Sequence, residues 1–207
     1  MVEGHQGAAS CDYGNVTQAE DFQLWVLRHG QTAWAASGRH TGRTDVPLTS
    51  EGEDEARALT GRLGAVRFDL VLSSPLERAF RTAELAGVRG IQLEPQAVEW
   101  DYGRWEGLTR AQILQQVPGW SAWDDGAMPG GETLEELAAR CRAVIDRIRR
   151  ESVVRALLVA HGHFLRVLAT QWIQQPAILA EHLLLGPARI GVLGHDRNSP
   201  AIERWNA

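Results

Sequence analysis

The sequence predicts an α/β domain with three layers, α/β/α, around a mostly parallel central sheet. Three short apolar runs have strand character, at residues 22–27, 69–73 and 156–160. The third run is apolar throughout, as expected of a strand that is covered on both faces. Segments with helical periodicity lie between and after these runs, and strands that alternate with helices are typical of domains with parallel sheets.

The helix starts are marked by pairs with capping-box spacing, in which a Ser or Thr and a Glu three residues later bond each other's backbone N–H groups. Three pairs match: Ser50 with Glu53, Ser74 with Glu77, and Thr133 with Glu136. Pro75 stands where a first helical residue is expected. From Thr133 onward one apolar stripe has helical spacing, and Cys141 lies on it. We therefore expect Cys141 to be a buried packing residue rather than a nucleophile. A further helix is expected over residues 163–172.

Length and composition favour one domain and exclude several enzyme classes. The chain has 207 residues, a formal net charge of −5, and no lysine, so that all 21 basic Lys+Arg positions are arginine. Codon preference explains most of that bias. Schiff-base enzymes, P-loop phosphate binders and protein kinases each need a lysine, so they are excluded. The acidic balance argues against nucleic-acid binding, and two cysteines cannot build a disulfide framework or a Cys-based zinc site.

The chain divides into a leader and a domain. Residues 1–21 are rich in Gly, Ala, Gln and Ser without periodicity, and we expect a flexible N-terminal leader there, followed by a single catalytic domain over 22–207. No apolar run approaches the ~20 residues that span a bilayer. The N-terminus lacks the features of a secretion signal. A cytoplasmic protein without membrane contact is therefore expected.

Polar residues follow each of the three predicted strands, where ligands bind in α/β sheets. Arg28-His29-Gly30 follows the first, Ser74-Pro75 with Arg78 the second, and His161-Gly162 the third. Arginine's planar fork matches phosphate oxygens, and a neutral imidazole, whose pKa neighbouring arginines would lower, is a competent nucleophile. Taken singly, each His-Gly pair is typical of a turn and Arg78 of a surface charge; together they predict a phosphate pocket.

Ordered blocks of the sequence resemble the histidine phosphatase superfamily, also called the phosphoglycerate mutase-like family. The blocks run in the family's order over about residues 22–175: Leu27–Thr32, Gly38–Gly42, Asp45–Thr49, Ser73–Pro75 with Arg78, Glu99–Gly103, Gly131–Thr133 and His161–His163. The resemblance implies the phosphoglycerate mutase-like fold.

The resemblance also implies roles for individual residues. His29 would attack phosphorus and form a phosphohistidine, and Glu99 would protonate the leaving group and then help to activate water. Three further groups would hold the phosphoryl oxygens: Arg28, Arg78 and His161. The substrate-binding positions implied are Arg39, Thr41, Tyr102, Arg110 and Gly162.

Two positions depart from the family pattern. Ala35 stands where many relatives have an asparagine that can bond the transferring phosphate. His163 replaces a smaller or amide residue. The pair His161 and His163 could suggest a metal, but no third ligand has matching spacing and the family's chemistry is metal-free, so we expect neither a metal nor another cofactor. Of the eight tryptophans, only Trp100 is expected to approach the pocket, although packing is an equal explanation for the group.

The resemblance leaves a choice of reactions. The block forms look most like the acid phosphatase and sugar-phosphate phosphatase branch, so we expect hydrolysis of a small phosphorylated metabolite. A phosphoglycerate mutase-type phosphotransferase is the alternative. It needs a second basic site, and residues 108–130 offer only Arg110 as a basic group and contain Asp124-Asp125, which would repel a second anionic group. A phospho-ligand-binding member without catalysis is disfavoured because the catalytic set is complete. Relatives are often homodimers, but the sequence does not set the oligomeric state, the substrate or the role of residues 1–21.

Overall fold

A computed structural model describes residues 22–207, and its centre is a six-stranded sheet in the order β3-β2-β4-β1-β5-β6. The four strands β3, β2, β4 and β1 are mutually parallel, whereas β5 runs antiparallel to β1 and β6 antiparallel to β5. The sheet is therefore mostly parallel, as the sequence predicts, with an antiparallel hairpin at one edge. The strand bounds are β1 Gln23–Arg28, β2 Leu70–Ser73, β3 Ile91–Leu93, β4 Arg155–Ala160, β5 Ile190–Asp196 and β6 Ser199–Arg204.

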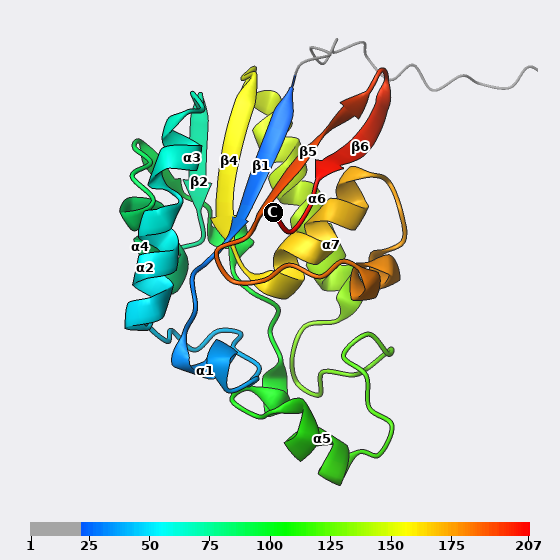
Figure 1. The fold of residues 1–207 in the computed structure, drawn as a ribbon. Coiled ribbons are helices and arrows are strands. Elements are labelled where there is room, and N and C mark those ends of the chain that lie inside the picture. The colour runs from blue at the N-terminus through cyan, green and yellow to red at the C-terminus, as the bar shows by residue number, and fades with distance from the viewer. Residues whose placement is uncertain (1–21) are drawn as a thin grey trace, which may run out of the picture.

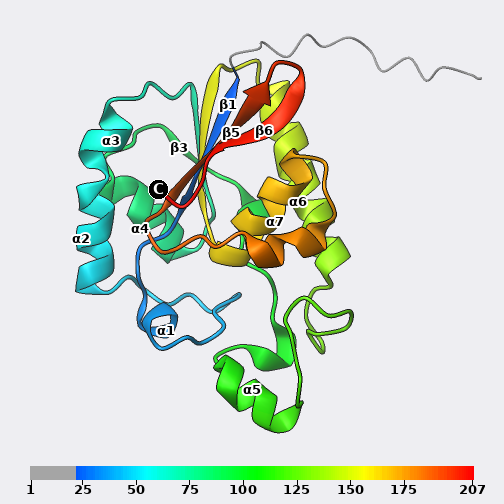
Figure 2. The same cartoon turned by 45° about the vertical axis from the view of Figure 1, so that its right-hand side comes forward.

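Helices cover both faces of the sheet, which gives the expected three layers. Helices α2, α3 and α4 lie on one face, and α6 and α7 on the other, while α1 and α5 lie below the ends of the strands (Figures 1 and 2). The helix bounds are α1 Ala33–Ala36, α2 Ser50–Ala58, α3 Thr60–Gly64, α4 Glu77–Leu85, α5 Arg110–Gln116, α6 Leu134–Arg150 and α7 Gly162–Trp172. Three short 3₁₀ helices within the described part of the chain are η1 Pro95–Ala97, η2 Gly103–Trp105 and η3 Ala177–His182.

Strand alternation divides the hydrophobic core in two. Successive side chains of a strand point to opposite faces, so in β1 Leu24 and Val26 pack under α6 and α7, whereas Trp25 and Leu27 pack under α2, α3 and α4. The strands β2 and β4 follow the same rule. Because both faces are covered, these strands have no polar face, and this explains the continuous apolar runs of the sequence.

The parallel strands bring the predicted site residues to one edge of the sheet. In the register of the sheet, Arg28 pairs with Ala160, and Ser73 pairs with Val159. The residues that follow these strands therefore emerge side by side, above the loops that carry α1 and α5 (Figure 1).

The structure confirms one predicted capping box and corrects two. Thr133 and Glu136 cap α6 reciprocally. Thr49, not Ser50, caps α2, because its side chain accepts from the Gly52 N–H. The prediction for Ser74 is wrong as well: α4 begins three residues later, at Glu77, and Pro75 is not its first residue.

Other predictions concern burial, the leader and the membrane. Cys141 is fully buried in the α6–α7 core, as expected. Within residues 22–207 no helix has the length and apolar character needed to cross a membrane. The predicted leader, residues 1–21, lies outside the described residues.

The α6 stripe should carry much of the stability of the domain. Leu137 has no exposed surface, and we expect Leu137→Ala to lower the free energy of unfolding by about 2–5 kcal/mol through lost burial and the cavity left behind. Leu93→Ala is the matched control, because Leu93 is 52% exposed on the edge strand β3 and should change stability by less than about 0.5 kcal/mol. Urea denaturation of both variants measures the difference; equal losses would contradict the assignment of the core.

Candidate active site

A cavity of about 500 Å³ lies at the carboxyl edge of the sheet. Its walls come from segments that are far apart in the sequence: the end of β1, the α1 region, the loop after η1, the start of α7, the loop before β5, and the C-terminal segment. The lining includes Arg28, His29, Ala35, Arg39, His40, Thr41, Glu99, Tyr102, Gly162, His163, Arg166, Leu184, Leu185 and Asn206. Arg28 and His29 at the end of β1 thus share one cavity with Glu99, the predicted proton donor.

His29 is buried and held in one orientation. Its ring Nδ1 lies 2.7 Å from the carbonyl oxygen of Gly30, so Nδ1 carries the proton and Nε2 keeps its lone pair. Burial, and after it the charges of Arg28 and Arg78, lower the pKa of His29 well below 6.5. The imidazole is therefore neutral at physiological pH, and Nε2 is available as a nucleophile.

Arg28 presents a hydrogen-bond donor without a partner. Its Nη1 donates to the carbonyl of Leu185 at 2.6 Å, but its Nε is buried and bonded to no acceptor among residues 22–207. Gly162 makes room for the guanidinium, because a Cβ there would lie 3.3 Å from the Arg28 Nε. A buried cationic donor that lines a cavity and lacks a partner points to an anionic ligand.

Arg78 and His161 form a buried pair behind the cavity. The Arg78 Nε donates to the His161 Nδ1 at 3.2 Å, and its Nη atoms donate to the carbonyls of Thr44 at 2.8 Å and Gly42 at 2.9 Å. Since Nδ1 of His161 accepts, its Nε2 carries the proton and donates to Ser74 Oγ at 2.8 Å. Burial and the charge of Arg78 lower the pKa of His161 well below 6.5. Arg78 thus fixes the tautomer of His161, and Ser74, read from the sequence as a helix cap, accepts the Nε2–H.

Glu99 sits on the N-terminus of α7. Its Oε1 accepts from the N–H groups of Phe164 at 2.8 Å and Trp100 at 2.9 Å, and its Oε2 accepts from the N–H of His163 at 3.1 Å. The helix has no side-chain cap of its own at His161, so the Glu99 carboxylate satisfies these N–H groups. Oε2 has a single donor and retains a lone pair that can take a proton from the cavity.

Arg140 of α6 holds the backbone on which Glu99 is carried. Its Nη1 donates to the carbonyls of Gln96 at 2.5 Å and Val98 at 2.8 Å, while its Nε and Nη2 grip the Glu132 carboxylate, both at 2.7 Å. Arg140 and Glu132 are both largely shielded from solvent, with 13% and 11% of their side chains exposed. Arg140 on α6 therefore holds the backbone on both sides of Glu99 in place.

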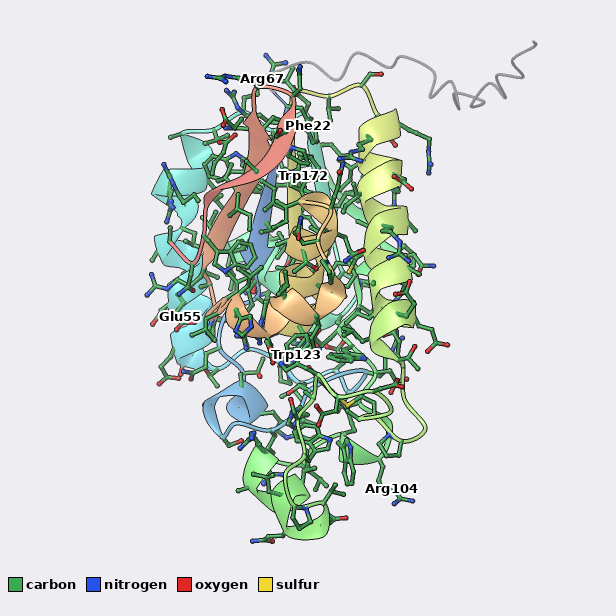
Figure 3. The ribbon with its side chains drawn as sticks, turned by 90° about the vertical axis from the view of Figure 1, so that its right-hand side faces the viewer. Phe22, Glu55, Arg67, Arg104, Trp123 and Trp172 are labelled. Carbon is green, nitrogen blue, oxygen red and sulfur yellow. The ribbon has the colours of Figure 1, made fainter. Side chains whose placement is uncertain are left out.

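The far side of the cavity is aromatic and basic. Tyr102 Oη and His163 Nδ1 lie 2.5 Å apart, and burial raises the pKa of Tyr102 and lowers that of His163, so both are neutral. Arg166, on α7, lies over the Trp123 ring, 4.8 Å from its centroid; Figure 3 labels Trp123 below α7. The Arg166 Nε donates to the Ala180 carbonyl at 2.9 Å, which fixes its guanidinium at the cavity wall.

The structure gathers most of the predicted substrate positions but not all of them. Arg39, Thr41, Tyr102 and Gly162 line the cavity. Arg110 does not: it is the first residue of α5 and is exposed.

The structure places Ala35 in the cavity wall and Trp100 outside it. Ala35 lines the cavity with a methyl group where an asparagine would offer an amide. The expectation for Trp100 is wrong, because Trp100 is buried behind Tyr102 and His163 and faces a second cavity of about 610 Å³.

Three cavity residues escape the sequence reasoning. Arg166 stands in a segment with no motif of its own, and a lone arginine on a helix is typical of a solvated surface. His40 lies within the Gly38–Gly42 block, but the resemblance implies roles only for its neighbours Arg39 and Thr41. His163 also lines the cavity. The only sequence signal for this position is that its histidine departs from the family pattern.

Within residues 22–207 no group of three or more His, Cys, Asp or Glu side chains is placed to hold a metal ion. His161 and His163 in particular have their ring nitrogens directed to different partners, Arg78 and Tyr102.

Comparison with known proteins agrees with this geometry. The model of the histidine phosphatase superfamily (branch 1) matches residues 24–207. The chain is 38% identical to an acid phosphatase of Mycobacterium tuberculosis, over 85% of this chain and 88% of that protein. It is 30% identical to a protein named as a probable phosphoglycerate mutase of Enterobacter sp. (strain 638), over 89% and 90% of the two chains.

A solved structure extends the likeness to the whole fold. The mycobacterial glucosyl-3-phosphoglycerate phosphatase, determined as a complex with VO3, superposes with a TM-score of 0.82 at 31% identity, over 90% of this chain and 99% of that one. Sequence, fold and site thus lead to the same assignment, and this chain belongs to the histidine phosphatase superfamily.

Proposed function

We propose that this chain is a metal-independent phosphomonoester hydrolase that acts on a small phosphorylated metabolite, such as a sugar phosphate, through a phosphohistidine on His29. The observation that carries the proposal is the neutral, oriented imidazole of His29 beside the unpartnered Nε of Arg28, in one cavity with the Glu99 carboxyl group. Relatives named as acid phosphatase and glucosyl-3-phosphoglycerate phosphatase support hydrolysis.

In the first step the His29 Nε2 lone pair forms a bond to phosphorus. The bond from phosphorus to the ester oxygen breaks, and Glu99 gives its proton to that oxygen, so an alcohol leaves. The charge on the phosphoryl oxygens is stabilised by the Nε–H of Arg28 and by the Arg78 guanidinium behind it. His161 acts in this state by holding Arg78, and contact between His161 and the phosphoryl group remains a prediction.

In the second step water attacks the phosphohistidine. Glu99, now ionised, takes one proton from the water, the oxygen bonds to phosphorus, and the bond from phosphorus to Nε2 breaks. Inorganic phosphate leaves, and both His29 and Glu99 return to their starting states. Glu99, which lines the cavity, carries the one proton that passes from water to the leaving group, and the second proton of the water leaves with inorganic phosphate.

The cavity walls favour a substrate whose leaving group carries a second anionic or polar group. Arg39 and Arg166 line the cavity along with the phosphoryl site, and guanidinium groups match carboxylate and phosphate oxygens. A sugar phosphate, a bisphosphate or a phosphorylated acid would place one phosphoryl group at the phosphoryl site and a second anionic or polar group against Arg39 and Arg166.

A phosphotransferase of the mutase type is the second candidate. The sequence argument against it noted only Arg110 in residues 108–130, but Arg166 supplies a basic group from another element, and one relative is named as a mutase. Asp124 and Asp125 line the second cavity rather than this one. We favour hydrolysis because the more similar relative is named as a phosphatase.

Replacing the nucleophile should abolish the covalent intermediate. We expect His29→Asn to show no acid-labile, base-stable phosphoenzyme after rapid quenching with labelled substrate, because the amide has no comparable lone pair. The parent protein should release phosphate from p-nitrophenyl phosphate at an unchanged rate in EDTA. Label retained on the variant would reassign the nucleophile, and loss of activity on chelation would reject the metal-independent reaction.

The decline of kcat/KM on the acid side of the pH profile should occur at low pH. Because burial holds the pKa of His29 well below 6.5, the imidazole stays neutral as pH falls through 6.5, and kcat/KM should decline only at lower pH. Profiles measured with two substrates whose phosphate pKa values differ separate the enzyme's limb from the substrate's. A substrate-independent midpoint at or above 6.5 would contradict the assignment.

Arg166 should serve the leaving group and not the phosphoryl group. We expect Arg166→Leu to raise KM about tenfold or more for substrates with a second anion, through the loss of a charge-assisted contact, with little change for p-nitrophenyl phosphate. Arg142→Leu, an exposed α6 arginine away from the cavity, is the control. An assay with 3-phosphoglycerate tests the alternative: interconversion faster than phosphate release would establish the mutase.

A further inference from the structure

Gly30, the residue that orients the nucleophile, is held through both of its peptide groups. The N–H of Gly30 donates to the Thr82 Oγ1 at 3.0 Å, and this hydroxyl donates in turn to the carbonyl of Arg78 at 2.7 Å. Thr82 has no exposed surface and lies on the inner side of α4. One buried hydroxyl therefore links the nucleophile loop to the helix that carries Arg78.

The second peptide group, between Gly30 and Gln31, lies between a carboxylate and the imidazole. Its N–H, from Gln31, donates to the Glu55 Oε2 at 2.9 Å, while its carbonyl oxygen, from Gly30, accepts from the His29 Nδ1 at 2.7 Å. Glu55 lies on α2 (Figure 3). The chain Glu55–peptide–His29 is thus continuous.

Close packing makes these hydrogen bonds decisive for the position of the loop. A Cβ on Gly30 would lie 2.3 Å from the carbonyl oxygen of Gly52, and a Cβ on Gly52 would lie 2.1 Å from that of Gln31. The two backbones are therefore in contact without intervening side chains. The side chains that bond the two peptide groups are Thr82 and Glu55, and the Ala188 N–H also donates to the His29 carbonyl at 3.1 Å.

We propose that Thr82 and Glu55 are positioning residues that act through the backbone of Gly30 to fix the Nδ1–H tautomer of His29 and to aim its Nε2 at phosphorus. The kinetic part of this inference rests on the proposed function, whereas the tautomer of the ring does not. In serine hydrolases a carboxylate holds the histidine Nδ1–H directly. Here the carboxylate of Glu55 does not contact the ring. It polarises the amide between Gly30 and Gln31, and the carbonyl of that amide becomes the better acceptor for the His29 Nδ1–H.

The indirect arrangement suits a histidine that must stay neutral. A carboxylate in contact with the imidazole would favour the imidazolium ion, which has no lone pair at Nε2. A carbonyl oriented by the carboxylate selects the tautomer without placing a full negative charge against the ring.

Thr82 is tested by an isosteric change. Thr82→Val removes the acceptor and the donor while keeping the shape, and we expect kcat to fall about tenfold or more with KM changed less than about threefold, since small misplacements of a nucleophile are costly. Thr82→Ser keeps the hydroxyl and should restore kcat to within about threefold of the parent. Thr170→Val is the control, because Thr170 is equally buried and its hydroxyl donates to the Val167 carbonyl on α7, away from the nucleophile loop.

Two variants of Glu55 separate the effect of its negative charge from that of its hydrogen-bond acceptor. Glu55→Leu should lower kcat as Thr82→Val does, and Glu55→Gln, which keeps an oxygen for the Gln31 N–H, should recover most of the loss. The ¹⁵N spectrum of the His29 ring gives a readout independent of activity: the parent should show the Nδ1–H tautomer, and Thr82→Val and Glu55→Leu should populate the Nε2–H form.

The outcomes are distinguishable. A ring that keeps its tautomer in both variants overturns the proposal, whatever happens to kcat. A kcat loss shared by Thr170→Val shows a general packing effect and overturns it as well. A parent protein that releases no phosphate, but whose ring tautomer shifts in the variants, rejects the proposed function while supporting the positioning role.

Discussion

The fully buried guanidinium of Arg78 is the interaction on which the rest of the site depends. It joins the carbonyls of the Thr41–Thr44 segment, helix α4 and His161, three parts of the chain that are distant in sequence. A buried charge is tolerated only when its donors find acceptors. Lysine has its three donors on a single nitrogen and could not span these acceptors, so the fork of arginine is required here for geometric reasons, whatever codon preference explains elsewhere in this lysine-free chain.

Burial then determines the chemistry of the two histidines that meet at the sheet edge. Their ring centroids are 5.2 Å apart, and both are neutral, so each has one donor and one acceptor nitrogen. His29 gives its Nδ1–H to the Gly30 carbonyl, whereas His161 receives the Arg78 Nε–H at Nδ1 and carries its proton on Nε2. The two rings thus hold opposite tautomers, and only His29 is left with an Nε2 lone pair. The hydrogen-bond partners of each ring, more than the residue type, therefore determine that His29 can act as the nucleophile and that His161 holds Arg78.

Much of this arrangement could be predicted from the sequence, because a strand covered on both faces has a distinctive apolar run. The strands β1, β2 and β4 and the residues after them follow from that signal alone. The strands β3, β5 and β6 do not: β3 has three residues, and Gly191 and Gly194 interrupt β5 where the side chain of Trp205 or Glu203 fills the space that a Cβ would need.

In the site, the residues with motifs were predictable, and those whose role depends on tertiary contact were not. Ser74 shows capping-box spacing but bonds His161, and Arg166 is typical of a surface arginine until α7 is packed beside the cavity. Local spacing carries no information on which buried acceptor a side chain will meet.

Glu99 shows how folding and catalysis use the same contacts. Helix α7 has no side-chain cap at its N-cap residue, His161, and the N–H groups of His163 and Phe164 would be unsatisfied if Glu99 did not accept from them. The helix N-terminus favours negative charge, so these N–H groups stabilise the carboxylate most in the state that it reaches after giving its proton to the leaving group. The cap is therefore strongest when the reaction needs it, because charge develops on Glu99 as the ester bond breaks. A single carboxyl group completes a helix in the resting protein and receives that helix's support during the chemical step.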